Sequence, residues 1–336
     1  NTVAKQDMGT VAIDGTTKTV QLGAAGKATN ITIGSDDTFS AGSSYALEVT
    51  GNWTNNNTFT AQNGTVTFSS TATGKTITPG SSSFYSLTFN GSGGNWSFTA
   101  PTVSVNNDFT ITSGTVTLPT ATTTIAGNFS NSGVFQPNNG VVLFTAATSK
   151  TIGTTATSSF YDMSFNGTGS WSFTTANATS SRHVSITAGT LTLPSGTFAV
   201  GGYFANNGGT FTHNSGTLKL TANNTQVVKL SGSSANNLTF SGIGGAWSFL
   251  DTNATSTGTF RIENGTTTLP SGTLAVGGSW AIAGGAFTHN SGTVKFNAGS
   301  TGQTIQPSTS SFYNTYFDGA GGGWTLSQSA TSTNNF

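Results

Sequence analysis

The chain lacks cysteine and carries very little charge. Its 336 residues contain no Cys, and ten Lys or Arg balance ten Asp or Glu, so the net charge is zero and only 6% of residues are charged. Without Cys there are no disulfides, no thiol catalysis and no Cys-ligated zinc. A neutral chain has no electrostatic attraction to nucleic acid and little repulsion between its own copies. We therefore expect no nucleic-acid partner, whereas self-association is permitted.

Long apolar runs are also missing. No run approaches the roughly 20 apolar residues that a membrane-spanning helix needs, so we expect no membrane insertion. The opening stretch "NTVAKQDMGT" has neither the basic nor the apolar region of a signal peptide and does not begin with Met. We interpret the sequence as a mature or trimmed chain.

The abundant residues favour short β-strands. Gly occurs 45 times and Phe 24 times, and Ser, Thr and Asn fill much of the remainder. Short runs such as "TLTL", "TLKL" and "NLTF" alternate apolar and polar residues, and Gly, Asn, Ser or Pro separates them. This period of two is typical of half-buried strands, and no window keeps the 3.6-residue period of a helix. The sequence predicts an all-β protein.

A 76-residue repeat organises the chain. Its anchors are glycines that precede a strand, tryptophans in "WSF"-like triplets and prolines in "TLP". They are Gly64, Gly140, Gly216 and Gly292; Trp96, Trp171, Trp247 and Trp324; and Pro119, Pro194 and Pro270. The glycines are 76 residues apart and the tryptophans 75 to 77. We predict a repeat array over 51–336, with approximate copies at 51–126, 127–200, 201–277 and 278–336, the last incomplete. Residues 1–50 diverge from the repeat, hold 8 of the 20 charges, and are predicted to be an N-terminal cap or docking segment.

Two architectures fit such a repeat. In a β-solenoid (a parallel β-helix), each copy would supply about three coils of roughly 25 residues, stacked about 4.8 Å apart. In the alternative, each copy would be a small β-sandwich of seven or eight strands. We favour the solenoid because the strands are short, the apolar content is low and no linker interrupts the pattern.

The anchor residues then acquire structural roles. In "WSF", Trp171 and Phe173 lie on one face of a strand, where we expect them to fill the core between coils. The alternative is an exposed aromatic ladder that stacks on sugars or on a neighbouring chain. The glycines follow Asn or Ser at strand starts, where positive φ is commonly required. The prolines end strands because proline cannot donate to the next ladder.

We find no constellation of residues that indicates catalysis or metal binding. His213 and His289 occupy matching positions of two copies, but Ala61 and Pro137 stand there in the others, so we predict loop histidines without fixed chemistry. The acidic residues are scattered, whereas glycosidases need a carboxylate pair. For the pair Asp36 and Asp37 we favour a solvated turn, and a cation site is the alternative. We predict no catalytic, cofactor-binding or metal-binding residues, no cofactor and no enzymatic activity.

The two ends of the sequence suggest assembly. The final "NNF" (334–336) aligns with "NDF" (107–109), so the chain stops within a copy. Either the natural protein continues beyond Phe336, or an open end docks on another subunit, because an uncovered coil offers unpaired backbone groups.

The unit "GNFSNSGVFQPNNGVVLF…SKTI…SSFYDMSFNGTGSWSF" resembles repeats of large bacterial cell-surface and secreted proteins of the adhesin and autotransporter-passenger type. The resemblance implies an extracellular or cell-surface, non-enzymatic scaffold. We therefore expect a structural protein, a subunit of a fibre, filament or stalk that joins copies of itself end to end by strand pairing. The alternative is an adhesin that binds glycans or cell surfaces through exposed aromatics, and a remote alternative is a polysaccharide-acting enzyme.

Overall fold

A computed structural model describes residues 5–155 and 157–335 of the chain, and all regular structure among them is β-strand. The strands pair in parallel and form a β-solenoid of about 16 turns. The number of residues between paired positions on neighbouring coils gives the length of a coil. It is 19 from Leu47 to Val66 and 25 from Trp280 to Ile305, and a separation of 20 is common. The predicted solenoid is confirmed. The alternative architecture of tandem β-sandwiches is wrong, because the sheets of a sandwich are built from antiparallel strand pairs.

The chain forms two compact units, Asn1–Met163 and Ser164–Phe336. This division tests neither the proposed cap at 1–50 nor the bounds of the copies, which stay predictions. Strands of residues 5–50 already belong to the same ladders as later strands. The strand β20 (Asp162–Phe165) contains the boundary between the two units.

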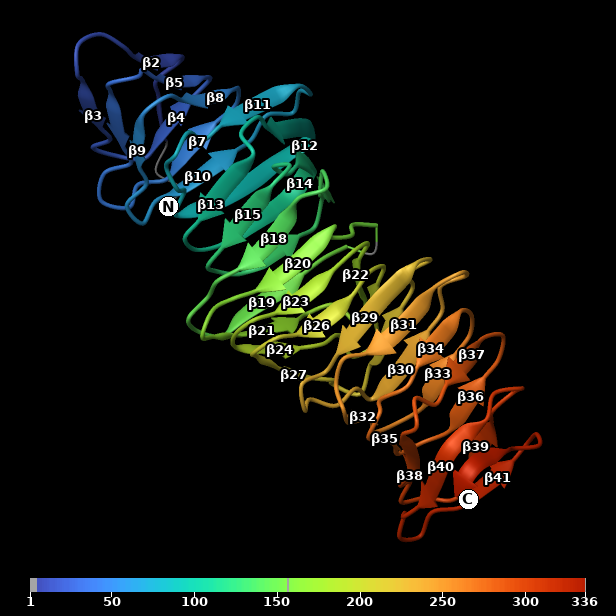
Figure 1. Ribbon diagram of the computed structural model, residues 1–336. Helices are drawn as coiled ribbons and strands as arrows, with labels where there is room; N and C mark the ends of the chain where they lie inside the picture. The colour runs from blue at the N-terminus through green and yellow to red at the C-terminus, as the bar shows by residue number, and fades with distance from the viewer. Residues whose placement is uncertain (1–4, 156, 336) are drawn as a thin grey trace. The chain divides into compact units, whose positions relative to one another are not determined.

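In the first unit, the strands of successive coils stack on three faces. The first face holds β1 (Gln6–Asp7), β4 (Gly26–Ala28), β7 (Leu47–Val49), β10 (Thr65–Phe68), the first parts of β12 (Ser86–Phe98) and β14 (Phe109–Thr117), β16 (Phe129–Asn131) and β19 (Lys150–Gly153). The second holds β2 (Val11–Ile13), β5 (Ile31–Ile33), β8 (Trp53–Asn55), β11 (Lys75–Thr78), the later parts of β12 and β14, and β17 (Val134–Gln136). The third holds β3 (Thr19–Gln21), β6 (Thr38–Ser40), β9 (Thr58–Thr60), β13 (Thr102–Val105), β15 (Thr122–Ile125) and β18 (Val141–Phe144). Figure 1 shows β13, β15 and β18 side by side.

The second unit has the same construction. One face holds β21 (Ser170–Phe173), β24 (Thr190–Thr192), β27 (Thr210–Thr212), β32 (Ala254–Ser256), β35 (Thr273–Val276), β38 (Thr293–Phe296), β40 (Phe312–Phe317) and β42 (Ser332–Asn335). The next holds β22 (Ala178–Ser180), β25 (Thr197–Val200), β28 (Thr217–Leu220), β30 (Asn237–Phe240), β33 (Phe260–Ile262), β36 (Trp280–Ile282), β39 (Gln303–Gln306) and β41 (Trp324–Leu326). The last holds β23 (Val184–Ile186), β26 (Phe204–Asn206), β29 (Thr225–Lys229), β31 (Ala246–Phe249), β34 (Thr266–Thr268) and β37 (Ala286–Thr288).

The core is a set of side-chain stacks that run from coil to coil. In β10, Val66 and Phe68 point inward and are fully buried, while Thr65 and Thr67 point outward. Phe68 stacks on Phe89 with ring centroids 5.5 Å apart, and Phe89 packs on Phe109 at 5.6 Å. Each buried Phe contributes about 1.5–3 kcal/mol of transfer free energy. Because every stacked residue covers the next, stability depends on contacts between neighbouring coils.

Successive copies of the repeat present the same motif on different faces. In the first unit, the strand after Gly64 is β10 on the first face, whereas the strand after Gly140 is β18 on the third. In the second unit, Trp171, Trp247 and Trp324 lie in β21, β31 and β41, one on each face. Paired residues of β10 and β12 are 21 residues apart, so one coil takes about 21 residues. One 76-residue copy therefore makes about 3⅔ turns. The expected three coils of 25 residues per copy are therefore wrong, since the coils are shorter and each copy ends a third of a turn out of phase.

Candidate functional site

The glycine and proline anchors meet between neighbouring coils. An ideal Cβ at Gly140 would lie 2.3 Å from the carbonyl oxygen of Pro119, and one at Gly216 would lie 2.1 Å from that of Pro194. At Gly292 the distance to the Pro270 oxygen would be 2.2 Å, and at Gly64 the nearest carbonyl, of Tyr45, would be at 2.5 Å. These contacts are too short for any side chain. The anchors are glycine because the previous coil's backbone occupies the place of a side chain.

Positive φ, which we expected at these glycines, occurs instead at residues just before them. In the later copies it falls on Asn139 (φ 60°), Ser215 (φ 58°) and Ser291 (φ 58°). The sequence therefore identified the glycine positions correctly, but the predicted reason for glycine there, a positive φ, is wrong. Asn and Ser tolerate the left-handed region better than β-branched residues do.

His213 and His289 support these turns. The backbone N–H of Ser215 donates to Nδ1 of His213 at 3.0 Å, and Ser291 donates to His289 in the same way at 3.0 Å. Both imidazoles are half-buried. This contact mimics an Asx turn, in which a side chain accepts a backbone N–H two residues on. The two histidines therefore shape a turn.

Three of the four tryptophan anchors lie in the core. Trp96, Trp171 and Trp247 are at most 1% exposed, whereas Trp324 in β41 is half-buried. Each of the three buried rings packs against a glycine of the next coil. An ideal Cβ at those glycines would lie 2.6–2.9 Å from the ring atom Cζ3; they are Gly114, Gly189 and Gly265. As expected, these three tryptophan rings fill the core, and they do not form an exposed aromatic ladder.

Sequence reasoning missed a buried polar pair. Asn55 is 1% exposed, and its Nδ2 donates to the Pro79 carbonyl at 2.8 Å and to Oγ of Ser82 at 3.2 Å. Oγ of Ser82 also accepts the backbone N–H of Phe59 at 2.9 Å. Asn131 and Ser158, and Asn206 and Ser233, form the equivalent pairs in the next two copies. The recurring "SS" before "FY" or "AN" was the available signal, but the partners stand 27 residues apart in sequence.

The charged residues form small surface networks. Glu48 bridges Lys5 at 2.8 Å and Lys27 at 3.7 Å, and the hydrogen bond from Lys5 holds the pKa of Glu48 below its ordinary value. Glu263 likewise bridges Lys219 at 3.0 Å and Arg261 at 3.1 Å, and its pKa is lowered chiefly by Lys219. These networks link side chains on stacked coils.

The pair Asp36 and Asp37 joins two coils. Asp36 lies in an exposed turn, as predicted, whereas Asp37 is buried, so the prediction of a solvated position is wrong for Asp37. Asp36 accepts the backbone N–H of Thr17 at 2.8 Å, and Asp37, fully buried, accepts that of Lys18 at 2.6 Å. Among the residues that the structure describes, no three His, Asp or Glu side chains gather as metal ligands would.

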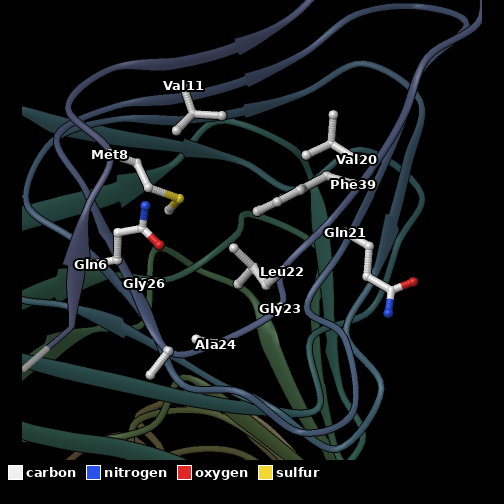
Figure 2. Close-up of a pocket in the computed structure, with 11 residues that line it drawn as sticks. Gln6, Met8, Val11, Val20, Gln21, Leu22, Gly23, Ala24, Gly26 and Phe39 are labelled. Atoms are coloured by element: carbon white, nitrogen blue, oxygen red, sulfur yellow. The ribbon is translucent and has the colours of Figure 1, made fainter. Parts of the chain in front are cut away.

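A pocket opens at the first described coil, and apolar side chains are exposed at the last. The pocket has a volume of about 180 Å³, and Met8, Val20, Leu22 and Phe39 surround it (Figure 2). On β40 and β41, the exposed apolar side chains are Tyr316 (55%), Phe317 (40%) and Leu326 (48%).

No family model, curated protein or solved structure matches this chain. In the described residues, no helix is long and apolar enough to span a lipid bilayer.

Proposed function

We propose that the protein is an extracellular structural protein, a subunit of a bacterial surface fibre, filament or stalk that assembles end to end by β-strand pairing. Its recurring residues support this proposal because most of them serve coil stacking. The glycines admit a neighbouring backbone, three of the tryptophans fill the core and the buried Asn–Ser pairs tie coils together.

One observation carries the proposal. Phe317 is 40% exposed, although the equivalent phenylalanines of the other copies, Phe89, Phe165 and Phe240, are fully buried. Leu326 is 48% exposed, although its equivalents Phe98, Phe173 and Phe249 are at most 8% exposed. Within the described residues, apolar side chains at core positions are thus exposed on β40 and β41. We infer that exposed strands with apolar side chains serve as a template for pairing with another chain.

An adhesin that binds glycans or cell surfaces through exposed aromatics is the alternative function. The burial of Trp96, Trp171 and Trp247 weighs against it, as does the change of face between copies, because a motif that rotates by a third of a turn cannot build one continuous aromatic face. A polysaccharide-acting enzyme remains the remote alternative.

Electron microscopy and sedimentation velocity test the proposal on the full chain. We expect the sedimentation coefficient to rise with concentration and fibres to form at neutral pH. Aligned fibres should give a reflection at about 4.8 Å along their axis, because coil stacking would run along the fibre. A chain that stays monomeric and folded at every concentration overturns the proposal, and a glycan-binding screen then tests the adhesin alternative.

A further inference from the structure

The turns at His213 and His289 depend on imidazole nitrogens that carry no proton. Nδ1 of His213 accepts the backbone N–H of Ser215 at 3.0 Å. Nδ1 of His289 accepts the backbone N–H of Ser291 at the same distance, 3.0 Å. A ring nitrogen accepts a hydrogen bond only while it is unprotonated, and both ring nitrogens of a protonated imidazole are donors. Protonation of either histidine therefore removes the acceptor and sets two N–H groups against each other.

The residues inside these turns have an unfavourable backbone conformation. Asn214 and Ser215 have φ of 48° and 58°, and Asn290 and Ser291 have φ of 46° and 58°. Consecutive left-handed residues other than glycine cost free energy and persist only where surrounding contacts hold them. In both turns the histidine carbonyl also accepts the N–H of the glycine anchor, at 3.0 Å. Protonation of the ring removes one of these two hydrogen bonds.

The surroundings of His213 offer a protonated ring no carboxylate to bind. Its turn hydrogen-bonds to residues 193–196 of the preceding coil and to residues 233–237 of the following coil. Neither segment contains a charged or titratable residue. The strand that follows the turn carries Lys219, a cation that is itself bridged to Glu263 at 3.0 Å. A positive charge on the ring therefore gains no partner from these segments that replaces the lost hydrogen bond.

The surroundings of His289 are equivalent except for one aromatic ring. Its turn hydrogen-bonds to residues 269–272 and 310–314 of the two neighbouring coils. Tyr313 is the titratable residue of these segments, and its ring centroid lies 5.2 Å from that of His289. The strand that follows the turn carries Lys295, which is engaged in an ion pair. A phenol is uncharged at neutral and acid pH, so this site also lacks an anion for a protonated imidazole.

The first two copies of the repeat form the corresponding turn without histidine. Ala61 and Pro137 stand at the histidine position, and their carbonyls accept the glycine N–H at 3.0 and 2.9 Å. Neither side chain titrates, and the proline ring fixes its own φ. Both of these turns lie in the first compact unit, whereas both histidines lie in the second. The dependence on an unprotonated side chain is thus confined to two corners of the second unit.

We propose that the two histidine turns are an acid-sensitive switch that loosens these corners as the pH falls from about 8 to 5, the range in which histidine side chains take up a proton. At the upper end the ring nitrogen accepts the backbone N–H and the turn is closed. At the lower end the nitrogen is a donor and the turn opens. Each turn ends at a glycine packed on a proline carbonyl of the preceding coil, so opening releases a close contact between coils. The switch does not depend on whether the protein assembles.

Asparagine at both histidine positions tests the proposal. Asn accepts a backbone N–H two residues on, as in an Asx turn, but does not titrate. Hydrogen exchange of the Ser215 and Ser291 amides, followed by NMR, is compared between the full-length wild type and the double variant His213→Asn, His289→Asn at pH 7.5 and pH 5. We expect about three- to tenfold faster exchange in the wild type at pH 5, which is the weight of one such hydrogen bond, and less than about a twofold difference at pH 7.5.

The turn at Pro137 supplies the internal control. The amide of Asn139, two residues after Pro137, should exchange at the same rate in both proteins at each pH. Equal exchange of the Ser215 and Ser291 amides in both proteins at pH 5 overturns the proposal, and so does an equally large difference at Asn139. If the double variant does not fold, the wild type alone decides. The ratio of the Ser215 rate to the Asn139 rate should then rise about three- to tenfold from pH 7.5 to pH 5, and a constant ratio refutes the switch.

Discussion

The glycine–proline contact between coils predicts a large effect of one added methyl group. In the variant Gly140→Ala the new Cβ would lie 2.3 Å from the Pro119 carbonyl oxygen. Carbon–oxygen contacts of this kind need at least about 3 Å, so the two coils must separate by roughly 0.7 Å. The neighbouring hydrogen bond from Val141 N–H to the Ala121 carbonyl, now 2.7 Å, would stretch with them. Overpacking of this kind costs about 1–3 kcal/mol, and we expect about 2 kcal/mol.

A second glycine of the same unit provides the control. Gly23 has no atom within 4 Å of an ideal Cβ and does not have a positive φ. Gly→Ala also restricts the unfolded chain, which stabilises the fold by about 0.4–1 kcal/mol where there is room. This contribution is common to both variants. We therefore expect Gly23→Ala to equal or slightly exceed the stability of the wild type, so that the difference between the variants reports the cross-coil contact.

Hydrogen exchange is the suitable assay, because a stack of coils does not have to unfold in one step. A loss of about 2 kcal/mol should speed exchange of the β18 amides (Val141–Phe144) about thirtyfold. Amides of β34 in the other unit should be unaffected. Equal exchange of the β18 amides in Gly140→Ala and Gly23→Ala would refute the reasoning, because the carbonyl contact would then have no energetic weight.

Three further predictions concern the other contacts between coils. Ser82→Ala leaves the N–H of Phe59 without its acceptor, and urea denaturation should show a loss of about 1–3 kcal/mol; a loss below a few tenths would contradict the role of the pair. Glu48 has a lowered pKa, so its contribution to stability is present above the ordinary glutamate pKa and is lost as the pH falls through the lowered value. Lys5→Met should therefore destabilise the fold by up to about 1 kcal/mol at pH 7 and have little effect near pH 2. Denaturation at both pH values measures this difference, and an equal loss of stability at pH 7 and pH 2 would show that the ion pair is not the cause. Trp171→Ala should cost about 3–5 kcal/mol through cavity formation, measured by thermal unfolding, and a shift of only a degree or two would place the ring outside the core.

Several features of the fold follow from single stretches of sequence. Alternation in runs such as "TLKL" predicts strands, and β28 occupies that run with Leu218 and Leu220 buried. The repeat indicated that Trp171 has a structural role, and its ring is buried. These features are local, because they depend on whether a strand turns alternate residues inward.

The pairs of residues that hold coils together could not be predicted in this way. Asn55 and Ser82 meet across 27 residues, and nothing in either segment specifies the other. The histidine turns were also missed, because a lone His in "THNSG" is equally consistent with a solvated loop. Only the folded turn places Nδ1 of His213 opposite the N–H of Ser215.

The sequence by itself determined the strands, the 76-residue repeat and the inward-facing aromatics, because each depends on residue type and spacing along the chain. The tertiary structure decided which face each copy occupies and why Gly140 must be glycine. The length of a coil depends on how its corners close over the coil below, and the separation of paired residues varies from 19 to 25. A 76-residue period is therefore not a whole number of coils, and the same motif points in a new direction in each copy.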